Sequence, residues 1–151
     1  VLYIANIRDS GWGGGNNVGA IVRAEFDPER LPAGIAEVVV THNGFRISFT
    51  RPVDPKLAGD RRNYQCSSYR RIASPAYGGE DTDRRMEQIV GVRAAEDDRS
   101  VEIELASPRT GFVYDWKLKN LMGPGVSFFP SEAYYSAQKF RRNLDHGFPS
   151  N

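Results

Sequence analysis

Short runs in which apolar and polar residues alternate recur along most of the chain, and each run ends at a turn signal. In the clearest run, residues 112–118, the alternate positions Phe112, Tyr114, Trp116 and Leu118 are all apolar, whereas Asp115 and Lys117 lie between them. Because successive side chains of a β-strand point to opposite faces, such a run predicts a strand with one buried face. No long stretch has helical periodicity, so the sequence predicts an all-β protein.

The runs predict about seven strands between residues 35 and 140. They cover residues 37–41, 45–49, 63–72, 88–94, 101–105, 112–118 and 133–140. His42-Asn43-Gly44 supplies a hairpin turn, since Asn-Gly is a strong turn signal. Residues 55–61 are expected to form a loop or one short helical turn, and residues 73–83 to be irregular. This spacing favours an immunoglobulin-like antiparallel β-sandwich. Cys66 is the only cysteine, so the disulfide of antibody domains is absent.

The N-terminal part of the chain has a different sequence pattern. Two strand-like runs flank a glycine-dense loop, which predicts a β-hairpin, and residues 27–34 with two prolines resemble a linker. We therefore predict a hairpin with its loop and linker over residues 1–34. The sandwich is predicted over residues 35–142, and a polar C-terminal tail over 143–151. An isolated hairpin is marginal in water, so this one is expected to pack on something.

Charge and composition exclude several classes of function. The chain has 20 basic and 19 acidic residues, which are interspersed and give a net charge of +1, so no basic stripe marks a nucleic-acid surface. No apolar run approaches the roughly 20 residues that span a bilayer, so no membrane span is expected in this chain. The lone Cys66 excludes an intrachain disulfide and c-type haem attachment. The chain starts at Val1 rather than Met, so we expect it to be processed or to continue upstream.

The sequence offers no set of catalytic residues. His42 and His146 are the only histidines, and neither has a context that suggests an activated serine or cysteine. The glycine-dense loop leads into a strand rather than a helix, which argues against phosphate binding. We expect a chain that is not an enzyme and carries no cofactor. A weak calcium candidate is formed by Glu80, Asp81 and Asp83, although they lack the spacing of an EF-hand loop.

The candidate partner-binding residues lie in three places. They are Arg8, Trp12, Asn16 and Asn17 of the hairpin, the pair Arg70 and Arg71, and the pair Tyr134 and Tyr135. Arginine and tyrosine are enriched in protein interfaces. Most of the arginine pairs are expected to be solvated or ion-paired, and only one tyrosine of an adjacent pair faces outward if the segment is a strand.

Two parts of the sequence resemble one family. Residues 2–15, running into 19–23, resemble the closing strands of bacterial β-propellers of the sugar-dehydrogenase (quinoprotein) type. Residues 45–55, with Asn63-Tyr64 and residues 111–114, resemble the immunoglobulin-like domain that follows such propellers. The resemblance implies an exported, periplasmic or extracellular C-terminal module whose hairpin is the remnant of a propeller blade. Only a hairpin of the propeller is present and the haem motif is missing, so the family's redox chemistry is not expected of this chain alone.

These observations lead to three hypotheses about function. The first is a non-catalytic extracytoplasmic module that docks onto other protein subunits and stabilises a larger assembly, with a redox or electron-transfer complex as the expected setting. The second is a fragment of a quinone-dependent sugar dehydrogenase. The third is a carbohydrate-binding module that uses Tyr134 and Tyr135.

Overall fold

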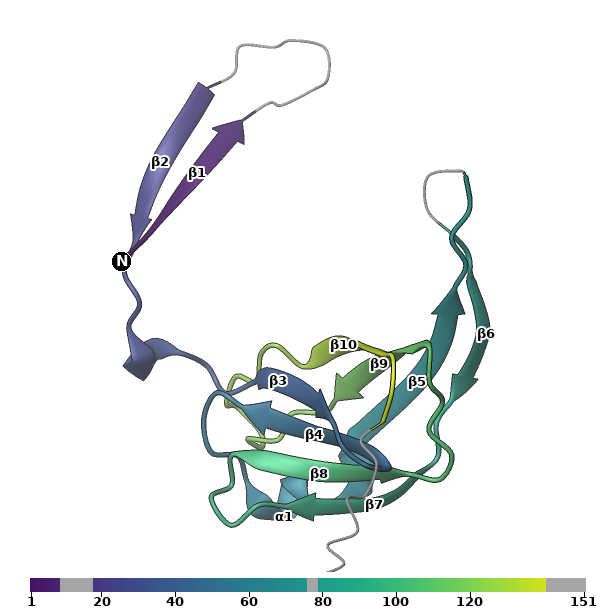
Figure 1. Ribbon diagram of the computed structural model, residues 1–151. Helices are drawn as coiled ribbons and strands as arrows, with labels where there is room; N and C mark the ends of the chain where they lie inside the picture. Colours follow the sequence, from purple (N-terminus) through teal and green to yellow (C-terminus); the bar gives the residue numbers. More distant parts are fainter. Residues whose placement is uncertain (9–17, 76–78, 141–151) are drawn as a thin grey trace, which may run out of the picture. The chain divides into compact units, whose positions relative to one another are not determined.

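The computed structural model describes residues 1–8, 18–75 and 79–140 of the chain, and for residues 6–8 and 18 it describes the backbone alone. It divides into two compact units, Val1–Leu31 and Pro32–Asn151 (Figure 1). The boundary predicted from the sequence lay after Gly34. The predicted tail, residues 143–151, lies outside the described residues.

The first unit contains the predicted hairpin. Strands β1 (Leu2–Arg8) and β2 (Val18–Ala24) pair antiparallel, with Leu2 opposite Ala24 and Arg8 opposite Val18. A 3₁₀ turn, η1 (Pro28–Arg30), follows β2. The Asp27 side chain begins this turn by accepting a hydrogen bond of 3.0 Å from the Glu29 amide, which satisfies a backbone donor that has no partner inside the turn.

The second unit is a sandwich of two four-stranded antiparallel sheets. Its strands are β3 (Ile35–Val40), β4 (Gly44–Phe49), β5 (Tyr64–Arg71), β6 (Asp81–Met86), β7 (Ile89–Ala94), β8 (Ser100–Leu105), β9 (Phe112–Leu118) and β10 (Glu132–Ala137). One sheet has the order β3-β4-β8-β7 and the other the order β10-β9-β5-β6 (Figure 1). The predicted all-β sandwich is confirmed, with eight strands where about seven were predicted.

The core lies between the inner faces of these two sheets. Phe45 of β4 is fully buried, and its ring lies 4.7 Å from the Tyr114 ring and 5.3 Å from the Trp116 ring of β9. Ile47 of β4 and Ile103 of β8 are buried beside them. The alternation predicted for residues 45–49, 101–105 and 112–118 is confirmed, because the alternate apolar residues of each run, beginning with its first, are buried.

Residues 73–83 were predicted to be irregular, and strand β6 corrects this prediction for residues 81–83, whereas the described residues 73–75 and 79–80 lie outside any helix or strand. Strand β6 pairs with β5 at the edge of its sheet, and nearly all of its side chains are exposed. An edge strand with two exposed sides has no reason to carry alternating apolar residues, and β6 carries charges instead. Between residues 50 and 63, the expected short helical turn is present as α1 (Pro55–Ala58), and a 3₁₀ turn, η2 (Arg61–Asn63), follows it.

A buried polar cluster ties β5 and β6 to the β8–β9 connection. The Glu87 carboxylate is almost fully buried, accepts hydrogen bonds of 3.0 and 3.1 Å from the Arg85 guanidinium and also accepts one from the Ser68 hydroxyl. Arg109 donates to the Ser68 hydroxyl at 2.6 Å, and its guanidinium lies 3.7 Å above the ring of Phe112. Burial of this kind is stable only when the charge is paired, as it is in this cluster.

Candidate interaction surfaces

The β1–β2 hairpin presents apolar side chains on both of its faces. Its register places Leu2, Ile4 and Val22 on one face, and Tyr3 and Ile21 on the other. All five are exposed, Tyr3 at 66% and Ile21 at 77%. Strands that are apolar on both faces are typical of positions covered from both sides. Among the described residues of this unit, no large apolar side chain is buried.

The predicted partner-binding residues of the hairpin are only partly placed. Arg8 is the last residue of β1, and Trp12, Asn16 and Asn17 lie outside the described residues. Arg23 of β2 forms an exposed ion pair of 2.6 Å with Glu25, and it faces the same side as Tyr3. The hairpin surface that the structure describes is therefore mainly apolar, with one ion pair on one face.

The two tyrosines proposed from the sequence point in opposite directions. Tyr134 is 61% exposed on the outer face of β10. Tyr135 points into the sandwich, where its ring packs edge-on against Phe45 at 5.5 Å between centroids. Of the two tyrosines named as partner-binding candidates, Tyr134 is therefore the one on the surface, and the Tyr135 side chain belongs to the core packing.

The two adjacent arginines of β5 likewise point to opposite faces of their sheet. Arg71 lies on the outer face of its sheet and forms an ion pair of 3.0 Å with Asp81. The Arg70 guanidinium lies 4.8 Å from the centroid of the Phe112 ring. Of these four residues, the structure places Tyr134 and Arg71 on the same outer face, that of the sheet β10-β9-β5-β6.

Arg84 is the centre of an ionic network on this face. It bonds Asp81 at 3.0 Å, Asp115 at 3.3 Å and the Ser67 hydroxyl at 2.9 Å, and it lies over the ring of Tyr69. The hydrogen bond from Arg71, with a second one from Arg84, lowers the pKa of Asp81. The network pairs its charges internally, which makes it a structural feature of the sheet.

The calcium candidates do not converge on one point. Asp81 is held by two arginines, and Asp83 forms an ion pair of 2.9 Å with Arg109. Glu80 is exposed in the residue before β6. In the part of the chain that the structure describes, no group of three or more His, Cys, Asp or Glu residues is arranged to hold a metal ion. Burial raises the pKa of the Cys66 thiol, which disfavours the reactive thiolate.

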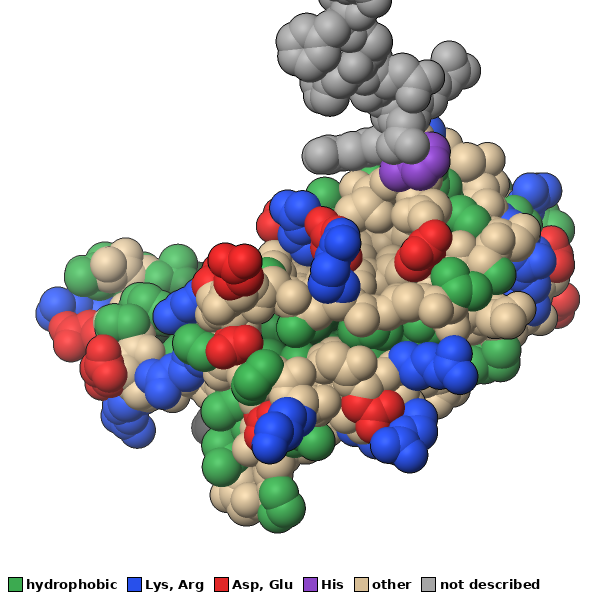
Figure 2. Space-filling model, turned by 90° about the horizontal axis from the view of Figure 1, so that it is seen from below, with side chains coloured by type: hydrophobic (Ala, Val, Ile, Leu, Met, Phe, Trp, Pro, Cys, Tyr) green, Lys and Arg blue, Asp and Glu red, His purple; other side chains and the backbone are tan. Residues whose placement is uncertain are grey.

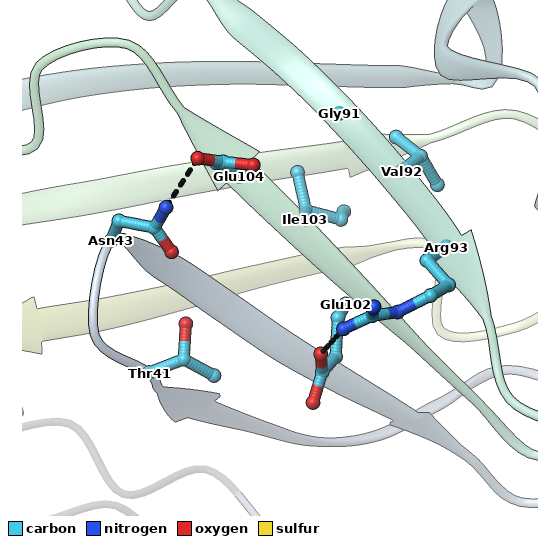
Figure 3. Close-up of a pocket in the computed structure, with 8 residues that line it drawn as sticks. All are labelled: Thr41, Asn43, Gly91, Val92, Arg93, Glu102, Ile103 and Glu104. Atoms are coloured by element: carbon cyan, nitrogen blue, oxygen red, sulfur yellow. Dashed lines mark hydrogen bonds and ion pairs between the residues drawn. The ribbon is translucent and has the colours of Figure 1, made fainter. Parts of the chain in front are cut away.

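The outer face of the other sheet carries a hollow that the sequence analysis did not find. This hollow, called the Gly91 hollow below, has a volume of about 220 Å³. Figure 3 shows its lining residues, which come from β7, β8 and the β3–β4 turn: Thr41, Asn43, Gly91, Val92, Arg93, Glu102, Ile103 and Glu104. The sequence signal for this hollow was Gly91 inside the strand-like run 88–94, because a glycine in a strand has no side chain to cover the face of the sheet.

Charged side chains of both signs are interspersed on the face of the molecule that Figure 2 shows. Figure 2 shows acidic and basic side chains alternating across the face in view, with hydrophobic side chains between them. No helix in the described part of the chain is long and apolar enough to cross a membrane.

Comparisons with known proteins find likeness in structure only. No family model matches the sequence, and no curated protein matches it. The fold is similar to that of the S-layer protein rSbsC(31-844), with a TM-score of 0.52 and 18% identity over 72% of this chain. The N-terminal part of the bacterial S-layer protein SbsC gives a TM-score of 0.53 and 17% identity over 74% of this chain. The chain spans only 14% and 24% of these two structures.

Proposed function

We propose that this chain is a non-catalytic module that docks onto other protein subunits and stabilises a larger assembly outside the cytoplasm. The observation that carries this proposal is the hairpin with two apolar faces. A two-stranded ribbon is marginal in water, and exposed strand edges with apolar side chains are sites for pairing with another sheet. A partner that covers both faces and pairs an edge satisfies all of these groups at once.

The mode of docking proposed for the hairpin is addition to a β-sheet of the partner. In this mode the backbone hydrogen bonds give affinity, and the alternating side chains give specificity. Tyr3 and Ile21 contribute large apolar areas on one face, and Leu2, Ile4 and Val22 contribute them on the other.

An immunoglobulin-like architecture for the sandwich is part of the same proposal. The strand orders β3-β4-β8-β7 and β10-β9-β5-β6 correspond to A-B-E-D and G-F-C-C′ of that fold. The Tyr114 hydroxyl of β9 donates to the Arg109 carbonyl at 2.9 Å, as in the tyrosine corner of such domains. The proposed location, periplasmic or extracellular, is supported by solved structures of similar fold that are named surface-layer proteins.

Site-specific photocrosslinking in the native host tests the docking. A photoreactive phenylalanine analogue is placed at Tyr3 for one face of the hairpin, at Val22 for the other, and at Val126 of the sandwich as the matched exposed control. Crosslinks to one and the same protein from Tyr3 and Val22, and none from Val126, are expected. A chain that purifies from its native source as a lone monomer, with no crosslink from either hairpin position, contradicts the proposal.

A second candidate is a fragment of a quinone-dependent sugar dehydrogenase, whose own propeller would then cover the hairpin. The same two-faced hairpin favours it. An open reading frame that continues upstream of Val1 for several hundred codons with propeller repeats supports this candidate, and a frame that starts just before Val1 excludes it. If the reading frame does continue upstream with propeller repeats, the module docks within its own chain. A redox or electron-transfer setting is then the expectation for the whole protein.

The carbohydrate hypothesis is left with less support. It proposed a binding surface of exposed aromatic side chains, and of the two tyrosines only Tyr134 is exposed. Binding on a glycan array that is lost in Tyr134→Ala is the result that would restore it.

A further inference from the structure

The Gly91 hollow owes its shape to the register of three neighbouring strands. Gly44 of β4 and Gly91 of β7 lie opposite Glu104 of β8, one on each side. In the next row along the sheet, Arg46 and Arg93 flank Glu102 in the same way. The first row therefore lacks the side chains that cover the second, and the sheet is hollowed beside Glu104 (Figure 3).

The hollow is lined by side chains that carry hydrogen-bond acceptors. The Glu104 carboxylate is exposed and accepts a hydrogen bond from the side-chain amide of Asn43. Figure 3 shows the Asn43 amide and the Thr41 hydroxyl on the same side of the hollow as this carboxylate. A carboxylate, an amide oxygen and a hydroxyl can each accept one of the three N–H groups of an ammonium ion.

The two carboxylates of the hollow differ in charge balance. Arg46 at 2.7 Å and Arg93 at 2.6 Å both bind Glu102, and these hydrogen bonds lower the pKa of Glu102. The ion pairs of the described residues leave Glu104 without a cationic partner. The negative charge of Glu102 is thus already compensated, whereas that of Glu104 is available to a cation entering over Gly91.

We propose that the Gly91 hollow binds a protonated primary amine, supplied by a lysine side chain of a partner protein. The ammonium group contacts Glu104, Asn43 and Thr41, and the methylene chain lies over the bare backbone at Gly91. Lysine suits this arrangement because its flexible stem carries a compact charge with three donors. The site belongs to the sandwich and is independent of the proposed docking of the hairpin.

Amide chemical shifts of the ¹⁵N-labelled full chain test the site. The probes are Nα-acetyl-lysine methylamide, the same compound acetylated on Nε, and 1,4-diaminobutane. The lysine probe is expected to bind saturably in the millimolar range, with shifts concentrated at Gly91, Asn43 and Glu104, and the Nε-acetylated probe is expected not to bind. Shifts that are equal for the charged and the acetylated probe, or that do not saturate, overturn the proposal. Tighter binding of 1,4-diaminobutane than of the lysine probe overturns the lysine source in favour of a free polyamine.

Three variants localise the binding. Glu104→Gln removes the charge but keeps the shape, and it is expected to weaken the lysine probe about fivefold, as for an exposed ion pair. Gly91→Val fills the hollow and is expected to abolish binding. Glu37→Gln removes an exposed carboxylate of β3 outside the hollow and serves as the matched control with unchanged affinity. Unchanged affinity in both Glu104→Gln and Gly91→Val, with all three spectra folded, refutes the assignment.

Discussion

At the scale of single residues, two glycines that flank the same glutamate differ in what a side chain would meet. A Cβ atom at Gly44 would lie 1.9 Å from the backbone oxygen of Ile103, so the strands β4 and β8 must shift to admit it. At Gly91 the nearest atom is Glu104 Oε2 at 3.5 Å, an ordinary contact. We expect Gly44→Ala to lower the free energy of unfolding by about 3 kcal/mol, as overpacking does. Gly91→Ala is expected to raise it by about 0.5 kcal/mol, since it removes a strand glycine. Urea titration of both variants checks the pair, and equal effects of the two substitutions contradict it.

The buried Glu87 carboxylate is expected to be far more sensitive to substitution than an exposed carboxylate. Its side chain is 2% exposed and is the shared acceptor of Arg85 and Ser68. Glu87→Ala leaves these donors without their acceptor and is expected to lower the free energy of unfolding by about 3 kcal/mol. Glu132→Ala is the control, because the ion pair between Glu132 and Lys117 is exposed and is expected to contribute less than about 1 kcal/mol. Denaturant titrations in which the two variants lose the same stability would contradict this difference.

The two arginines on Glu102 predict a pH dependence. Hydrogen bonds from Arg46, and then from Arg93, hold the pKa of Glu102 below its ordinary value of 4.5. A carboxyl group whose pKa is lower in the folded state stabilises the fold above its unfolded pKa, and this stabilisation is lost as the pH falls through the folded pKa. Unfolding free energies measured from pH 7 to pH 2 are therefore expected to fall less steeply below pH 4.5 in Glu102→Gln than in the wild type. Parallel curves for the two proteins would contradict the assignment.

At the scale of elements, burial on one face decides what could be predicted from the sequence. Strand β9 was predicted because its inner face fills the core with Phe112, Tyr114 and Trp116. Strand β6 was missed because no face of it is buried, and its pairing with β5 is held by backbone bonds and ion pairs. The Gly91 hollow was missed for a related reason. It depends on which residues of β4, β7 and β8 lie in one row, and this register is not encoded in any single run of residues.

The hairpin is expected to behave differently from the sandwich strands in the isolated protein. The described side chains of the two strands are exposed, except that of Ala24, which is half-buried. The backbone hydrogen bonds between β1 and β2 therefore open at a low free-energy cost. Hydrogen exchange followed by mass spectrometry is expected to show fast exchange in β1 and β2 and slow exchange in β4, β8 and β9. In the proposed complex with a partner protein, the hairpin is expected to become protected. Strong protection of β1 and β2 in the isolated monomer would contradict the idea that the hairpin depends on a partner.

At the scale of the whole molecule, the division into two units predicts that stability resides in the second one alone. Every buried apolar side chain of the described chain lies between Ala33 and Ala137, within the unit Pro32–Asn151. Removal of residues 1–31 therefore takes away no buried side chain of the core. We expect the truncated protein to keep the thermal midpoint of the full chain to within about 2 °C, since a loss of 1 kcal/mol shifts the midpoint of a domain of this size by roughly 4 °C.

The same truncation separates stability from assembly. A chain that lacks residues 1–31 is expected to unfold like the full chain and yet not to bind the proposed partner, because the apolar residues of both hairpin faces are gone. Full-length protein with Tyr3→Ser and Val22→Ser provides the matched case, in which the chain length is kept and only one large side chain on each face is reduced. Calorimetry and co-purification from the native host are measured on the same three proteins. A truncated chain that still co-purifies with the partner would move the docking surface from the hairpin to the sandwich. A truncated chain with a much lower midpoint would show that the hairpin belongs to the fold of the sandwich itself.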